Sequence, residues 1–231
     1  MITPFDFYEI TKKIQSNLYQ GTSKKLLNKA HGNLTSFGNK LVKKKQNIFK
    51  NILEIGAGSG ELFEHVDKDF ENYFMTDISD WGKKDILDLA SLDQRIKFEI
   101  QNVEKLSYSE DCFERVLVSC VIAHVTEPYQ ALEELRRVTK PGGIISIFVS
   151  TDPGILLKLI RNILTKPRMS NLPIPYELCN SIQHRNTPSS IMEMTRWIFK
   201  DDYVKINYYP FKIKSWNLST HLIINIVKKS N

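Results

Sequence analysis

The chain has 231 residues, of which 42% are hydrophobic and 25% are charged. This composition is ordinary for one globular domain with a sizeable core, and the lack of any apolar run of about 18 residues predicts no membrane-spanning helix. Three widely spaced cysteines predict neither a disulfide framework nor a zinc site, and with no secretory signal they indicate a cytoplasmic protein. The net charge of +6 suits binding of a nucleic acid or an anionic substrate. Short runs of lysines account for much of this charge, and such runs are usually solvated and without a partner.

The first part of the chain predicts helices. Residues 3–30 are amphipathic with a break near Gly21, and the polar, basic residues 31–46 include another helix. We expect residues 1–47 to form an N-terminal helical cap over a core of residues 48–231. Tyr8, Tyr19 and His31 would then close over the site as a lid with aromatic rings facing a cation, or else pack between helices.

Strands and helices alternate from residue 51 onward. Short apolar runs predict five strands, at residues 51–55, 73–77, 96–100, 115–119 and 144–149. Helices are predicted at residues 60–67 and 129–138, the second ended by Pro141 and the glycines after it. Such alternation indicates a parallel sheet with right-handed crossovers.

Beyond residue 150 the alternation loosens. Helices are predicted at 154–165 and 189–199, and a loop with prolines at 166–176. β-Branched and aromatic residues predict two late strands, at 203–209 and 218–227. We expect residues of about 153–200 to form a helical substrate insertion in the core, because loops held on a rigid sheet usually carry specificity.

A glycine-rich turn follows the first predicted strand. Its spacing is E-x-G-x-G-x-G, formed by Glu54, Gly56, Gly58 and Gly60. Glycines let a ligand approach the backbone, and the helix start beyond them favours an anionic group such as a methionine carboxylate. The acid suits the ammonium end of the same ligand, directly or through water. A nicotinamide dinucleotide would need a glycine where Glu61 stands, and a turn without function is the other alternative.

Asp77 ends the second predicted strand. A carboxylate at that position can accept hydrogen bonds from both hydroxyls of a ribose. The alternative is that Asp77 caps a following helix. With the glycine-rich turn beside it, the ribose is favoured.

Five segments in order resemble the motifs of class I S-adenosylmethionine-dependent methyltransferases of the small-molecule, type 11-like branch. They are residues 52–60, 101–106, 111–116, 119–125 and 135–143. The resemblance implies an α/β, Rossmann-like fold with a seven-stranded sheet, mostly parallel with an antiparallel last strand, and helices on both faces. It also implies S-adenosylmethionine as the cofactor.

Further cofactor contacts follow from the same resemblance. The glycine-rich turn, Ala57 included, would bind the cofactor, and the backbone near Cys120 would hold its methionine end. The adenine would lie near Ile78, Asn102 and Val103. Asn102 stands where the family usually has aspartate, and its amide oxygen can still accept a hydrogen bond from the adenine amino group.

The acceptor would bind at the carboxyl ends of the fourth and fifth strands. His124 follows the fourth strand and is a candidate general base, although a histidine packed beside the cofactor loop fits equally. Asp152 follows the fifth strand and could hold a substrate hydroxyl or amine, or cap the next helix. His184, Arg185 and Asn186 form a polar cluster suited to a polyol or an anion, and the alternative is an exposed turn. We treat His124 and His184 as the catalytic candidates.

A looser resemblance concerns residues 152–154, 184–186, 208–211 and 215–218. These are similar to segments of bacterial small-molecule methyltransferases associated with surface-glycan biosynthesis. The leading expectation is methyl transfer, without a metal, to a hydroxyl or amine of a small molecule, with a sugar, sugar nucleotide or other phosphorylated acceptor favoured. One alternative is a nucleic-acid or protein methyltransferase, although residues 120–123 do not match the N-P-P-Y motif of enzymes that methylate DNA amino groups. The other is a cofactor-binding protein without catalysis.

Overall fold

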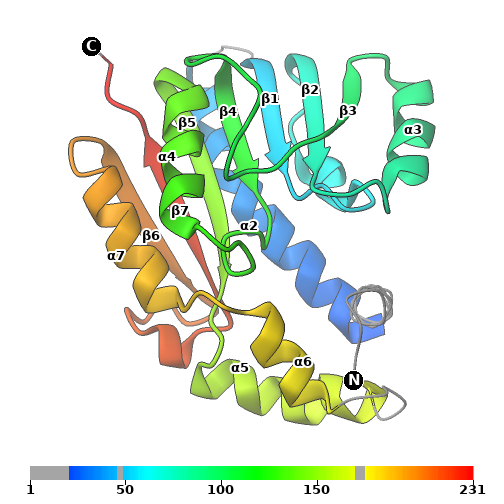
Figure 1. Ribbon diagram of the computed structural model, residues 1–231, viewed down its shortest axis with the longest axis vertical. Coiled ribbons are helices and arrows are strands. Elements are labelled where there is room, and N and C mark those ends of the chain that lie inside the picture. Colours follow the sequence, from blue (N-terminus) through cyan, green and yellow to red (C-terminus); the bar gives the residue numbers. More distant parts are fainter. Residues whose placement is uncertain (1–20, 46–48, 170–174, 231) are drawn as a thin grey trace.

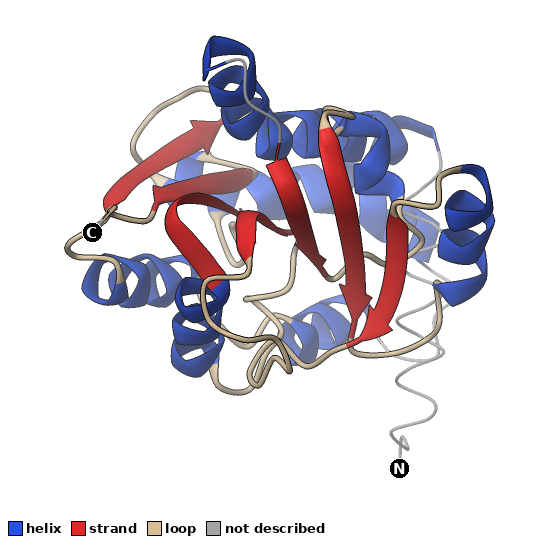
Figure 2. Ribbon diagram, turned by 90° about the horizontal axis from the view of Figure 1, so that it is seen from above, coloured by secondary structure: helices blue, strands red, loops and turns tan. Residues whose placement is uncertain are grey.

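The computed structural model describes residues 21–45, 49–169 and 175–230, and its centre is a β-sheet with helices packed around it (Figure 1 and Figure 2). Seven strands pair in the order β3-β2-β1-β4-β5-β7-β6. The strands are β1 Phe49–Ile55, β2 Phe70–Asp77, β3 Ile96–Ile100, β4 Phe113–Val118, β5 Thr139–Ser150, β6 Tyr203–Tyr209 and β7 His221–Val227.

The directions of the strands confirm the predicted fold class. β1 runs parallel to both β2 and β4, and the parallel set continues to β3 on one side and β5 on the other. β7 is antiparallel to both of its neighbours, β5 and β6. The sheet is therefore mostly parallel with an antiparallel last strand, as the sequence predicts.

Helices cover both faces because the inner strands are apolar on both sides. Ile52 and Leu53 are adjacent in β1 and both buried, but they belong to separate core clusters, since neighbouring side chains of a strand point to opposite faces. One cluster includes residues of α4 and α7, and the other includes residues of α2 and α3. The α-helices are α2 Gly21–Lys45, α3 Lys83–Leu92, α4 Pro128–Val138, α5 Ile155–Ile160, α6 Tyr176–Gln183 and α7 Pro188–Ile198.

The described part of the expected cap is one continuous helix. α2 passes through residues 31–33 without interruption, so the prediction of a separate helix after residue 31 is wrong. Ala30 and Leu34 are buried, and α2 packs against β4, β5, β7 and the 3-10 turn Glu61–His65. Burial of this apolar stripe on the sheet outweighs the roughly 1 kcal/mol that a glycine costs within a helix. Tyr8 and Tyr19 lie outside the described residues.

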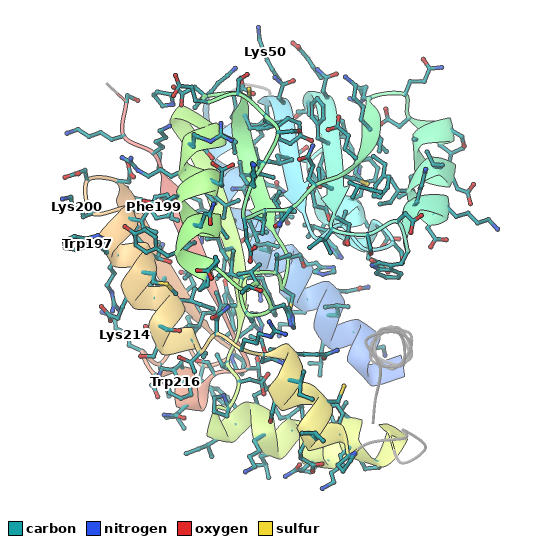
Figure 3. All side chains as sticks on the ribbon, viewed as in Figure 1. Lys50, Trp197, Phe199, Lys200, Lys214 and Trp216 are labelled. Atoms are coloured by element: carbon teal, nitrogen blue, oxygen red, sulfur yellow. The ribbon has the colours of Figure 1, made fainter. Side chains whose placement is uncertain are left out.

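The helical insertion lies at the carboxyl ends of the strands. α5 packs against the 3-10 turn Trp216–Leu218. In Figure 3 the labelled Trp216 of this turn lies far from Lys50, which is near the start of β1 at the opposite edge of the sheet. α5 continues as a π-turn, Arg161–Thr165, and a 3-10 turn, Lys166–Met169. Among the described residues, no helix is long and apolar enough to cross a membrane.

Candidate active site

The glycine-rich turn is held open at the carboxyl end of β1. Gly56, Gly58 and Gly60 have φ values of 73°, 57° and 86°, a region that side chains other than glycine rarely adopt. A Cβ at Gly60 would lie 2.8 Å from Leu89 Cδ1. The N–H groups of Gly56 and Ala57 both donate to the Thr76 carbonyl, at 2.8 and 2.9 Å. The turn is therefore fixed against the end of β2 in the conformation that its three glycines allow.

Asp77, at the end of β2, fits a nucleoside. Its Oδ2 accepts from the N–H of Gly58 at 3.2 Å and its Oδ1 accepts from the N–H of Ser79 at 3.2 Å. Oδ2 keeps the capacity for a further hydrogen bond, and Oδ1 gains one if a ribose hydroxyl replaces the Ser79 hydroxyl, which donates to it at 3.4 Å. Ile78 beside it is 72% exposed and offers an apolar surface for a base. Because α3 begins only at Lys83, the alternative that Asp77 caps a helix is wrong.

The two residues after β3 that are expected to contact the adenine differ in exposure: Asn102 is exposed and Val103 is buried. Asn102 follows β3, and its Oδ1 accepts from the N–H of Glu104 at 2.9 Å. An amide oxygen can accept a second hydrogen bond, so Asn102 fits the role that the sequence assigns to it. Val103 is buried in the core cluster of α4 and α7. The contacts of Asn102 and Val103 with an adenine stay predictions.

Glu54 lies beneath the turn. Its side chain is buried, and its Oε2 accepts a 2.7 Å hydrogen bond from the hydroxyl of Tyr73. Its Oε1 has no partner among the described residues. Burial raises the pKa of Glu54 to about 8, although the Tyr73 hydrogen bond opposes the shift. The carboxyl group therefore faces the core, and its contact with a ligand ammonium group stays a prediction.

The loop after β4 is tied to the insertion. Cys120, the second residue of this loop, has a positive φ of 61°. Asn186 donates from Nδ2 to the carbonyls of Ile122 and Val125, at 2.9 and 2.8 Å. Because both amide hydrogens are used in this way, Asn186 positions the loop and does not offer its N–H groups to a substrate. The ring nitrogen Nδ1 of His124, in the same loop, lies 2.9 Å from the Gln183 carbonyl oxygen.

Asp152 gathers a polar cluster at the end of β5. Its Oδ2 accepts from Ser150 Oγ at 2.9 Å and lies 3.5 Å from His184 Nε2, and its Oδ1 accepts from Asn180 Nδ2 at 3.1 Å and from the guanidinium of Arg161. We call these five residues the Asp152 cluster. Burial acts to raise the pKa of Asp152, but Arg161 and His184 outweigh it and the pKa is lowered. Burial lowers the pKa of His184 to about 4, against the attraction of Asp152.

The structure thus brings Asp152, His184 and His124 together. The His124 and His184 rings lie 4.7 Å apart between centroids. Burial raises the pKa of the Cys120 thiol to about 11, and Arg161 and Asp152 act on it in opposite directions, so the end of β4 lies within electrostatic reach of the Asp152 cluster. The alternative of a helix cap at Asp152 is wrong, because the N-cap of α5 is Gly154.

Sequence reasoning missed some residues of the site and misplaced others. The sequence does not identify Arg161 or Asn180, both of which contact Asp152, Arg161 through an ion pair. Arg185 itself is exposed, and its contact with an acceptor stays a prediction. His31 is buried, with its Nε2 3.5 Å from Ser119 Oγ at the end of β4, and its part in a lid stays a prediction.

Comparisons with known proteins agree with this fold. A family model described as a methyltransferase domain matches residues 53–147. The ubiquinone/menaquinone biosynthesis C-methyltransferase UbiE of Rickettsia prowazekii is 31% identical over 122 residues, which are 48% of this chain and 49% of that protein. The PKS-NRPS hybrid synthetase cheA of Chaetomium globosum is 31% identical over 112 residues, which are 44% of this chain and 2% of that protein. The chain spans at most half the length of these relatives.

Solved structures extend the likeness to nearly the whole chain. The N-methyltransferase NodS from Bradyrhizobium japonicum, in complex with S-adenosyl-L-homocysteine, has a TM-score of 0.64 at 11% identity and covers 96% of this chain and 98% of its own. The plantazolicin methyltransferase BpumL has a TM-score of 0.66 at 18% identity, over 94% of this chain and 90% of its own. Residues 53–147 therefore match a methyltransferase domain, and the chain shares the Rossmann-like fold of these solved methyltransferases.

Proposed function

We propose that this chain is an S-adenosylmethionine-dependent methyltransferase that acts on a small polar molecule. One observation carries the proposal: two sites of different chemistry adjoin at the carboxyl ends of the strands. The glycine-rich turn and Asp77 suit a nucleoside, and the Asp152 cluster with His124 suits a polar acceptor. Binding crevices of open α/β sheets lie at this edge.

The cofactor would supply the chemistry, a methyl group on a sulfonium. Asp77 would accept hydrogen bonds from the ribose hydroxyls, and Ile78 and Asn102 would border the adenine. The glycine-rich turn and the backbone at Cys120 would hold the methionine end. The protein's own part is alignment of the two reactants and exclusion of water, which converts a bimolecular reaction into an intramolecular one. Residues 1–47 would cover the site as a cap, and residues of about 153–200 would enclose the acceptor.

For the acceptor we propose a hydroxyl-rich molecule such as a sugar or a sugar nucleotide. The Asp152 cluster supports this, because it presents a carboxylate, an amide and a hydroxyl within one small region. The looser resemblance of residues 184–186 and the net charge of +6 also favour a glycan precursor that carries phosphate. Arg185, exposed beside the cluster, would meet such a group at its rim.

Calorimetric titration with S-adenosylhomocysteine tests the cofactor site. Asp77→Asn should raise Kd by about 10- to 150-fold, because one charge-assisted hydrogen bond of roughly 1.5–3 kcal/mol is lost. Asp80→Asn is the matched control, since Asp80 is an exposed acid three residues further on, and its Kd should equal that of the wild type. No binding to the wild type, or equal affinity of both variants, would refute the assignment.

A further inference from the structure

The side chain of His124 is held in one tautomer. Its Nδ1 lies 2.9 Å from the backbone oxygen of Gln183. A carbonyl oxygen can only accept a hydrogen bond, so Nδ1 must carry the proton and Nε2 keeps its lone pair. The side chain is exposed to solvent, whereas His184 beside it is only 10% exposed. His124 therefore carries an unprotonated ring nitrogen, and its ring lies beside His184 of the Asp152 cluster, with the two ring centroids 4.7 Å apart.

From this geometry we infer that His124 is the general base of the reaction and that the group methylated is a hydroxyl. The inference rests on the proposed function and names the substrate class for it. A neutral amine already has a free lone pair and needs no base, whereas a hydroxyl has to lose its proton as it is alkylated. A general base at this place therefore favours a hydroxyl over an amine.

The surrounding groups suit a base that works at neutral pH. Although His124 is exposed, the protein atoms around its ring exclude part of the water and so lower its pKa; the Gln183 carbonyl and Asp152 oppose this shift, and Arg161 adds to it. The imidazole is therefore neutral at pH 7. Once it takes a proton, Asp152 is the anion that stabilises the imidazolium, and Arg161 keeps that stabilisation moderate. His184, whose ring lies beside that of His124, is neutral at the same pH.

The loop that carries His124 is fixed from two sides. Asn186 clamps the carbonyls of Ile122 and Val125, and its own N–H donates to the Ala123 carbonyl at 3.1 Å. The residues before and after His124 are thus anchored to the insertion that also supplies Gln183. Asn186 is a positioning residue, because it acts on the base only through this loop.

The step balances without any further reactant. The acceptor oxygen forms a bond to the methyl carbon, the carbon–sulfur bond breaks and its electron pair stays on sulfur as a neutral thioether. The hydroxyl proton passes to Nε2 of His124. Because the side chain is exposed, the imidazolium can return this proton to solvent before the next turnover.

A spectroscopic test needs no acceptor. Protein labelled with ¹⁵N-histidine is studied by long-range ¹H–¹⁵N correlation at pH 7.5, and the His124 signals are assigned by their loss in His124→Gln. The expected result is a protonated Nδ1 and an unprotonated Nε2. A proton on Nε2, or a doubly protonated ring, would overturn the inference. The cofactor site is untouched by this test.

The kinetic test uses matched acceptors and S-adenosylmethionine labelled in its methyl group. A nucleotide sugar is compared with its amino-sugar counterpart, and methyl transfer should go to oxygen. His124→Gln should lower kcat by roughly 10²–10⁴-fold and abolish the fall in kcat at acid pH, with Kd for S-adenosylhomocysteine unchanged. His65→Gln is the control, since His65 lies in the 3-10 turn Glu61–His65 outside the cluster, and it should keep the wild-type kcat.

Rescue separates a lost base from a damaged site. Free imidazole added to His124→Gly should restore part of kcat, with the restored rate rising with imidazole concentration. Transfer to nitrogen in the wild type, or full kcat in His124→Gln, would overturn the inference and leave the methyltransferase proposal standing. Absence of S-adenosylhomocysteine binding in the wild type would instead refute the proposed function.

Discussion

Two glycines of α2 provide a matched test of how this helix packs on the sheet. A Cβ added at Gly32 would lie 3.9 Å from His65 Nδ1, an ordinary contact. A Cβ added at Gly38 would lie 2.5 Å from Nε and 2.7 Å from Cζ of Arg115, whose side chain is buried between α2 and β4. Arg115 also donates from Nη2 to the Leu34 carbonyl at 3.4 Å, so the guanidinium has little room to move.

The two substitutions should therefore have opposite signs. Replacing glycine with alanine inside a helix stabilises it by about 0.5–1 kcal/mol, chiefly by restricting the unfolded chain. Gly32→Ala should gain this amount. At Gly38 the same gain is opposed by overpacking against Arg115, which costs about 1–3 kcal/mol. We expect Gly38→Ala to be destabilised by up to about 2.5 kcal/mol, a decrease in Tm of up to roughly 10 °C.

Urea unfolding of the wild type and both variants measures the difference. In an Arg115→Ala background the atoms that the new Cβ would meet are absent, so Gly38→Ala should become stabilising there, and the double-mutant cycle gives the coupling energy. If Gly38→Ala is as stabilising as Gly32→Ala in the wild-type background, Arg115 does not pack against α2 as described.

Three further predictions follow from buried and clustered groups. Burial lowers the pKa of His31 from 6.5 to about 4, so the unfolded chain binds more protons between these values and stability falls as the pH falls through them. Between pH 7 and pH 5 the free energy of unfolding of His31→Gln should fall by about 2 kcal/mol less than that of the wild type. An equal fall in both proteins would contradict a neutral His31. Asn186→Ala should cost about 1–3 kcal/mol in urea unfolding, because the carbonyls of Ile122 and Val125 lose their donor; an unchanged midpoint would show that the clamp is dispensable. Methyl transfer should survive EDTA, since no three metal-ligating side chains gather among the described residues, and activity lost to EDTA and restored by magnesium would disprove this.

The sequence predicts the sheet better than the insertion. Apolar runs stopped by glycine or acid identify the strand ends, and with them Asp77, His124 and Asp152, because the carboxyl ends of parallel strands share one edge. Pro173 and Pro175 predict a loop in the insertion, whereas Pro175 is in fact the N-cap of α6.

Arg161 and Asn180 escaped prediction for a different reason. Each lies in a helical segment, where a lone polar side chain is most often solvated. Their pairing with Asp152 depends on how the π-turn and α6 are placed in space, and no local spacing encodes that placement. Gly32 and its polar neighbours predict a break in the helix, but burial of Leu34 against the sheet favours one continuous α2.

The position of β7 has a consequence for how this chain folds as it is synthesised. β5 ends at Ser150, but the strand that pairs with it begins at His221, after the whole insertion and β6. β1 to β4 can therefore pair while the ribosome is still making the insertion, whereas β5 keeps an open edge until β7 arrives between it and β6. Leu222, Ile223 and Ile224 complete both core clusters at that moment. A nascent chain stalled before His221 would expose apolar strand edges, so it is the species that chaperones or proteases would meet.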